Sequence, residues 1–442
     1  MTTPADPARR RAMLIVFLVV FIDLLGFGIV LPLAPRYARE YMAGWSDLWQ
    51  GATIGAIYSS FSLMQFVFAP VLGRLSDRYG RRPIMLLSLA GSVVFYSLFA
   101  VASTLPPEQG TLALVLLLLS RVGAGVAGAS VSTASAVIAD CTTPETRARG
   151  MGLIGAAFGI GFTFGPLIAY VGLEFFQSAH WGPGALAAGL SAVALVLAYI
   201  LMPETRKPGG PTGAKEFFSL RRTREVLAMP TVGRLVLVYF LVIFGFATFE
   251  GTLALFTADA FGLDEKGNFL VFAYIGFVLM VAQGGFYRRL AGKRPERQLM
   301  AVGVGLMLLG FVGLTAVAGG GWMLRQAGGS GANLNGLFYL AVTVAVFGFA
   351  FVNPSVASLV SKAADPHRQG EVLGVNQSFA ALGRIAGPVA GLLVFAQHPS
   401  RGLPFVLGIV VLGLVAALLA QDSPQRPREG AEEDRNPGPI NS

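Results

Sequence analysis

The stretch Gly73–Pro83, with the sequence GRLSDRYGRRP, lies between two apolar runs, residues 51–72 and 84–104. Each run is long enough to cross a membrane, which takes about 20 mostly apolar residues in a helix. Two glycines permit sharp turns, and a proline suits the first turn of the next helix. The stretch therefore predicts a tight hairpin at a membrane face. Its charged residues are one acid, Asp77, and four arginines, Arg74, Arg78, Arg81 and Arg82.

Composition places the chain among polytopic membrane proteins. Of its 442 residues, 54% are hydrophobic and 13% charged, and the mean hydropathy is +0.65. The net charge of +9 does not indicate nucleic-acid binding, because the basic residues lie in short loops between apolar runs. A single cysteine, Cys141, excludes an internal disulfide framework. We find no metal-ligand cluster, nucleotide-binding loop or nucleophile–base pair, so we expect neither an enzyme nor a cofactor.

The hydropathy pattern predicts an all-α protein with twelve spans. Because residues 12–34 are long enough to span and lack a convincing cleavage site, we interpret them as an uncleaved first helix. The predicted spans are 12–34, 51–72, 84–104, 111–139, 150–173, 183–202, 231–258, 267–287, 298–320, 334–361, 370–396 and 402–420. The predicted division is an N-terminal six-helix half (1–202), a cytoplasmic central linker (203–230), a C-terminal six-helix half (231–420) and a disordered cytoplasmic tail (421–442).

The distribution of basic residues predicts the orientation. If the N-terminus is cytoplasmic, inner segments hold 26 of the 33 Lys and Arg residues. The outer loops hold only Arg36, Arg39, Lys266, Arg325 and Arg401. By the positive-inside rule both termini then lie in the cytoplasm.

The sequence also repeats itself. Gly152, Gly161, Gly165 and Pro166 of the fifth span recur in the eleventh, all at one constant offset, as Gly374, Gly383, Gly387 and Pro388. The charged hairpin has a weaker echo in the second half of the chain, at a slightly shorter offset. Two six-helix halves of the same orientation explain both offsets.

Apart from Arg234 and Glu371, which lie close to span ends, four charged residues fall within the predicted spans. Asp23 and Glu250 are acids at membrane depth, where a charge is costly and usually functional. For Asp23 the alternatives are a proton or cationic-substrate site and a structural carboxylate; Glu250 could instead be hydrated near the outer mouth. Arg121 needs an acceptor, for which backbone of the first helix and Asp23 are candidates. Arg384 could bind an anionic substrate or pair with an acid.

Four amides are further candidates for lining a substrate cavity, although such residues more often form hydrogen bonds between helices. They are Gln65, Asn353, Asn376 and Gln377.

The hairpin resembles the signature loop of major facilitator superfamily transporters, through Gly73, Asp77, Arg78, Gly80, Arg81 and Arg82. GLIGAAFGIGFTFGPLIAY (152–170) resembles the antiporter signature of the fifth helix, and LSRVGAGVAGAS resembles the fourth-helix Arg-Gly motif. Across 12–170 the chain is similar to the tetracycline-efflux branch of the drug:proton antiporters. Phe95 stands where those exporters carry an acid in the third helix, which argues against tetracycline itself as the substrate.

The resemblance implies a monomeric transporter of the cell (cytoplasmic) membrane, in contact with lipid and driven by the proton gradient. It implies export of a small amphipathic compound, with Asp23, Asp77 and Arg121 at the functional positions of the branch. We expect protons to be coupled through Asp23 and Arg121 and, because it is an acid at membrane depth, through Glu250. Because an acid is attracted to the positive N-terminus of a helix, we also expect Asp77 to face the start of the eleventh helix, near Gly370, and to hold the cytoplasmic side shut. The alternatives are a facilitator or proton symporter for an organic anion or metabolite, and a receptor or scaffold without transport.

Overall fold

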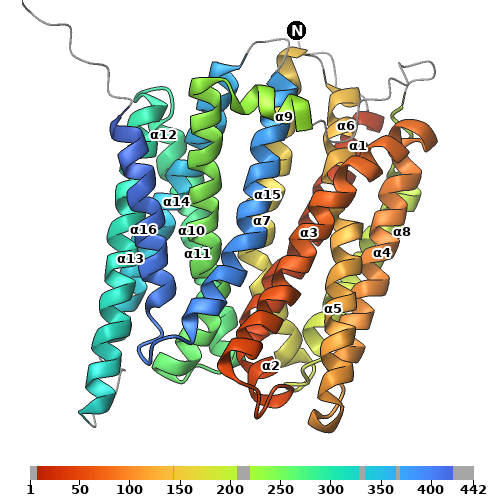
Figure 1. The fold of residues 1–442 in the computed structure, drawn as a ribbon. Coiled ribbons are helices and arrows are strands. Elements are labelled where there is room, and N and C mark those ends of the chain that lie inside the picture. Colours follow the sequence, from red (N-terminus) through yellow and green to blue (C-terminus); the bar gives the residue numbers. More distant parts are fainter. Residues whose placement is uncertain (1–6, 143, 207–219, 328–333, 365–368, 422–442) are drawn as a thin grey trace, which may run out of the picture.

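The computed structural model describes residues 7–142, 144–206, 220–327, 334–364 and 369–421 (Figure 1). Within these ranges the regular secondary structure is helical, and no strand occurs apart from one isolated bridge between Ala291 and Arg294. The N-terminal half consists of α1 (Pro7–Val30), η1 (Leu31–Leu33), α2 (Ala34–Glu40), α3 (Asp47–Tyr79), α4 (Arg81–Ala102), η2 (Pro107–Gln109), α5 (Gly110–Ala127), η3 (Gly128–Ser130), α6 (Val131–Cys141), α7 (Pro144–Phe175) and α8 (Gly182–Leu201).

A short helix, α9 (Leu220–Leu227), precedes the C-terminal half. That half consists of α10 (Pro230–Phe261), α11 (Glu265–Val281), η4 (Ala282–Tyr287), α12 (Arg288–Leu290), α13 (Glu296–Gln326), α14 (Asn335–Ala363), α15 (Gln369–Phe395) and α16 (Leu403–Ala420). The start of α1 and the end of α16 lie at the same end of the bundle (Figure 1), which we call the terminal face. The other end is the opposite face.

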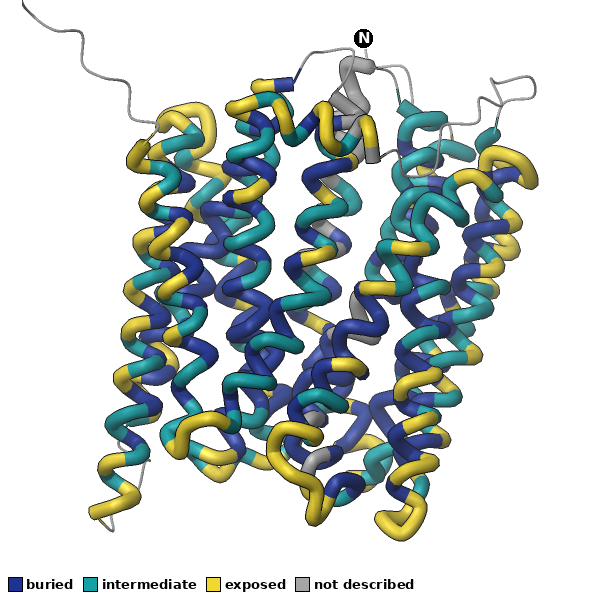
Figure 2. Tube along the Cα trace, viewed as in Figure 1, coloured by how far each residue is buried: buried dark blue, intermediate teal, exposed yellow. Residues whose placement is uncertain are grey.

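Eleven described helical segments are long and apolar enough to cross a membrane. The remaining long helix, α7, has 32 residues, of which Ile160–Phe175 form a shorter apolar stretch. Buried residues are concentrated inside the bundle and exposed residues on its outside (Figure 2). Many of the exposed residues are large and apolar. On α4, for example, Leu87, Val94 and Val101 are 61%, 60% and 53% exposed. Their regular spacing, two helical turns apart, places them on one helix face, as expected of a surface in contact with lipid.

The two halves repeat one packing contact. A Cβ atom at Gly28 of α1 would lie 2.8 Å from the ring of Pro166, and one at Gly251 of α10 would lie 2.9 Å from Pro388. The offset between the two glycines is almost the same as that between the two prolines. In both halves, therefore, a glycine of the first helix accommodates the proline of the fifth, which agrees with the repeat predicted from the sequence.

The halves meet at the opposite face. A Cβ atom at Gly51 of α3 would lie 2.7 Å from the carbonyl oxygen of Leu392 of α15, and the Ser59 hydroxyl donates to the carbonyl of Ile385 (2.6 Å). On the other side of the bundle, a Cβ atom at Gly276 of α11 would lie 2.9 Å from the backbone nitrogen of Thr163 of α7. From their contact, α3 and α15 diverge toward the terminal face (Figure 1).

Candidate functional site

The charged hairpin predicted between the second and third spans is almost entirely helical. Helix α3 continues through Gly73 to Tyr79, and α4 begins at Arg81. Only Gly80 interrupts the helices, with φ of +104°, a conformation that glycine adopts far more readily than other residues. The predicted hairpin is therefore tighter than the apolar runs indicate, because both helices extend past those runs and turn at one residue.

Arg81 pairs with the acid of the hairpin and with the acid that follows the fourth predicted span. Its guanidinium lies 2.5 Å from Asp77 and 3.1 Å from Asp140, and it donates to the hydroxyl of Ser76 (2.7 Å). In this conformation Asp77 thus pairs with an arginine of its own half. Gly370, its expected partner across the bundle, belongs to the first turn of α15, whose side-chain surroundings lie outside the described residues.

Glu204 completes this network and was missed by the sequence analysis. Its carboxylate accepts hydrogen bonds from the backbone N–H groups of Arg81 (2.9 Å) and Arg82 (3.1 Å), at the start of α4, and of Arg206 (2.9 Å). Partial burial raises the pKa of Glu204, but these N–H groups outweigh it and hold the pKa below its usual value of 4.5. The signal available in the sequence was an acid directly after the sixth span, because the free N–H groups of a helix N-terminus attract carboxylates.

Asp23 lies inside the N-terminal half, 2% exposed. The hydroxyl of Ser130 donates to its Oδ2 (2.8 Å), and its buried Oδ1 accepts no hydrogen bond from the described residues. A Cβ atom at Gly128 would lie 3.5 Å from the Asp23 carboxyl carbon and 2.9 Å from Nε2 of Gln65. Gln65 donates to the carbonyl of Gly128 (3.1 Å). The structure therefore brings Asp23 and Gln65 together where α1 and α3 meet η3.

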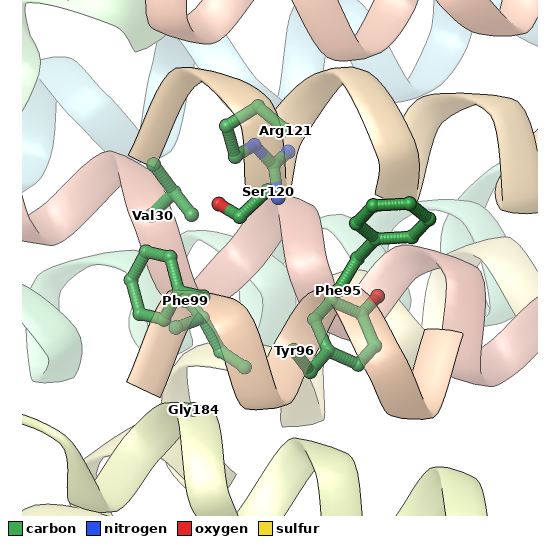
Figure 3. A pocket seen from close by; sticks show the side chains of 8 residues that line it. Val30, Phe95, Tyr96, Phe99, Ser120, Arg121 and Gly184 are labelled. Carbon is green, nitrogen blue, oxygen red and sulfur yellow. The ribbon is translucent and has the colours of Figure 1, made fainter. Parts of the chain in front are cut away.

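Arg121 is buried in the same half but forms no ion pair with Asp23. Its guanidinium lies over the ring of Phe61, 4.4 Å from the centroid. Figure 3 shows Arg121 and Ser120 beside Phe95, Tyr96 and Phe99. These side chains fill the space and leave no room for a ligand there. Of the two acceptors considered for Arg121, Asp23 is excluded in this conformation.

Glu250 and Arg384 both lie in the C-terminal half and interact electrostatically. Glu250, 7% exposed, has no hydrogen-bond partner for Oε1 among the described residues, so the interpretation as a hydrated acid near the mouth does not fit its burial. Its charge acts on Arg384, but the two are too far apart for an ion pair. Arg384 is half-buried and, within the described part of the chain, forms neither an ion pair nor a hydrogen bond. The guanidinium of Arg384, a cation at membrane depth, is therefore available to bind an anion.

The predicted amides differ in their surroundings. Asn353 accepts a hydrogen bond from the hydroxyl of Tyr239 (2.6 Å), a residue that also lies close to Arg384. Asn376 is 1% exposed, and its amide has no partner among the described residues. Gln377 is exposed. Asn353 therefore joins helices, as such residues usually do, whereas Asn376 is a buried polar group whose hydrogen bonds are not made within the described chain.

The antiporter-like motif forms close helix contacts. Gly161, Gly165 and Pro166 are buried in α7, and Gly152 lies near its start. In the second copy, a Cβ atom at Gly387 would lie 2.7 Å from the carbonyl oxygen of Phe244 of α10. Small residues permit such approaches between helices in a membrane.

Comparison with known proteins agrees with this architecture. The family model described as Major Facilitator Superfamily matches residues 16–388 and 316–441. The chain belongs to the major facilitator superfamily. Among relatives in this superfamily, the class C tetracycline resistance protein of Escherichia coli is 31% identical, over 90% of this chain and 94% of its own. Major facilitator superfamily domain-containing protein 10 of Homo sapiens is also 31% identical, over 88% of each chain.

A crystal structure of the human organic anion transporter MFSD10 (TETRAN) shares 26% identity and has a TM-score of 0.65, covering 94% of this chain and all of that one. Membership in the major facilitator superfamily makes the chain a multi-pass membrane transporter rather than an enzyme, with a small molecule as its substrate. The major facilitator fold predicted from the sequence is confirmed.

Proposed function

We propose that the protein is a proton-coupled exporter of small amphipathic compounds in the cell membrane, working by alternating access. Under this proposal the terminal face is cytoplasmic, because the inner segments of the predicted topology hold 26 of the 33 Lys and Arg residues. The opposite face, where the halves meet, is then the outer face. The structure would represent the state closed to the outside.

The observation that carries the proposal is the setting of Asp23. A buried carboxylate without a counter-ion is costly, and its Oδ1 lacks even a hydrogen bond among the described residues. Such a group can exchange its proton with water only when the surrounding helices move apart. Because it gains and releases the proton in different conformations, proton movement is coupled to the switch between them. The tetracycline resistance relatives support export as the direction.

Proton flux in proteoliposomes tests the proposal. Purified protein is reconstituted with an imposed pH gradient and offered a panel of amphipathic drugs and organic anions. We expect substrate-dependent proton movement that Asp23→Asn abolishes. Glu225→Gln is the matched control, because Glu225 is an exposed acid on α9 that pairs with Arg221 of the same helix (3.1 Å). Transport that survives Asp23→Asn and ignores the gradient would refute proton coupling at this residue.

A second candidate function is a facilitator or proton symporter for organic anions. It is favoured by Arg384, a cation at membrane depth without an ion pair among the described residues, and by the likeness to the human organic anion transporter. A guanidinium presents several donors to a carboxylate or sulfonate. Loss of anion transport in Arg384→Gln, with gradient-independent uptake in Asp23→Asn, would favour this candidate over the exporter.

A further inference from the structure

Ion pairs between the halves gather at the opposite face. Among described residues, four pairs cross from one half to the other: Arg401–Asp47 (3.1 Å), Lys266–Glu174 (2.7 Å), His180–Glu265 (3.2 Å, an ion pair when the imidazole is protonated) and Arg36–Glu265 (3.9 Å). All the residues involved belong to loops or helix ends at that face. Together we call them the clamp.

At the terminal face the described ion pairs have another pattern, because each stays within one half. Arg81 pairs with Asp77 and Asp140 of the N-terminal half, and Lys362 pairs with Glu296 of the C-terminal half. In this conformation, charge–charge contacts between the described residues of the two halves thus hold only the opposite face.

Arg401 bridges both halves within the clamp. It lies in the connection between α15 and α16, and its guanidinium reaches Asp47 at the start of α3 as well as Asp259 near the end of α10 (3.2 Å). The residue adopts a left-handed backbone, with φ of +57°, which is uncommon for a side chain of this size. The guanidinium also lies over the ring of Phe395, 5.2 Å from its centroid. Backbone and ring together aim it at the two acids.

The same three charged side chains line a pocket of about 270 Å³ between the halves. Arg39 and Gln50 of the N-terminal half lie on one side of it, and Leu392 and Phe395 of the C-terminal half lie on the other. A pocket bounded by both halves must widen if they separate at this face. Arg401 bridges its two sides and therefore stands where the passage would open.

We infer that Arg401 is the gate residue of the opposite face, and that the clamp must break each time the transporter opens there. The inference rests on the proposed transport by alternating access. An exposed ion pair contributes little free energy on its own. The clamp therefore shifts the equilibrium between the states closed and open at the opposite face without fixing the protein in either. Removing one pair should change the ratio of the states by about two- to five-fold.

Distances between labels on the two halves test this without any substrate. Trp49 of α3 and Met323 of α13 are exposed, 65% and 64%, and neither belongs to the clamp. Spin labels at Trp49→Cys and Met323→Cys, in a Cys141→Ser background and in nanodiscs, report the separation of the halves at the opposite face. We expect Arg401→Gln to increase the long-distance population several-fold.

A charge swap separates a specific contact from general damage. Glu174→Lys places two cations together and should open the face, whereas Glu174→Lys combined with Lys266→Glu restores the pair and should return the distribution toward wild type. Lys362→Glu, which breaks a pair inside one half at the terminal face, is the control and should not increase the long distances.

The inference is refuted if Arg401→Gln and Glu174→Lys leave the label distances unchanged. It is also refuted if the double variant Glu174→Lys/Lys266→Glu increases the long-distance population by as much as the two single variants combined. The wild-type transport assay is independent of these measurements. If the protein carries no substrate but the variants open as expected, the proposed function fails and the clamp stands. If transport is found and the distances do not move, only the clamp fails.

Discussion

Gly276 offers the sharpest perturbation of the balance between the halves. A Cβ atom at this position of α11 would lie 2.9 Å from the backbone nitrogen of Thr163 and closer still to its Cα, where ordinary contacts begin at 3.4 Å. Gly276→Ala therefore requires the two backbones to move apart in the observed conformation. Overpacking of this kind costs about 1–3 kcal/mol. If the halves separate at this contact in the alternative state, the substitution destabilises the observed state only.

The expected result is a shift of the population away from the observed state by about 5- to 150-fold, the factor that corresponds to about 1–3 kcal/mol. Label distances between Trp49 and Met323 measure it, and slower transport should accompany it. Gly284→Ala, in the continuation of the same helix, is the control because a Cβ atom there would meet no neighbouring helix or side chain within 4 Å. A distance distribution in Gly276→Ala equal to that of wild type would refute the reasoning, as would a lowered melting temperature with unchanged distances.

Two further predictions concern packing and pH. Gly387→Ala should destabilise the protein by about 1–3 kcal/mol, because its Cβ would lie 2.7 Å from a backbone oxygen of α10. Thermal unfolding measures this loss of stability. Gly374→Ala is the control and should destabilise the protein far less, because the space around Gly374 is open. Glu204→Ala should lower stability at pH 7 by about 1 kcal/mol through the lost N–H bonds. Since the pKa of Glu204 is lowered on folding, its contribution is present above pH 4.5 and is lost as the pH falls through the lower folded value. The difference between wild type and Glu204→Ala should therefore disappear in strong acid, and an equal difference at all pH values would contradict the assignment.

The sequence predicted the architecture well because its signals are periodic and redundant. Apolar runs of sufficient length allow little besides membrane helices, since backbone polar groups in lipid must be satisfied internally. The recurrence of the Pro166 motif at Pro388 predicted two similar halves, and the glycine–proline contacts repeat in the structure with almost the same offset. Helix ends were predicted less well. Hydropathy stops at the membrane surface, whereas α3 and α4 continue beyond it until Gly80 separates them.

The sequence predicted which residues belong to the candidate site, but not which of them contact each other. Asp23, Glu250, Arg121 and Arg384 could be recognised because a charge inside an apolar run is conspicuous. Which of them meet depends on helix rotation and tilt, which a single sequence does not encode locally. Asp23 lies beside Ser130 rather than Arg121. The acid that follows the sixth span was overlooked because such a residue is unremarkable until the helix N-terminus beside it is known.

The buried charges are arranged differently in the two halves, and each arrangement suits a different function. In the N-terminal half the buried acid has a hydroxyl partner and no cation, which suits a group that binds and releases a proton. In the C-terminal half an acid and an arginine act on each other at a distance, and the arginine has no ion pair among the described residues. That arrangement suits a ligand group able to replace the acid as the counter-charge. Because α3 donates from Ser59 to the carbonyl of Ile385, the residue next to Arg384, movement of the N-terminal half directly displaces the backbone that carries this arginine. Proton exchange in one half and ligand affinity in the other can thus be coupled through a single contact between α3 and α15.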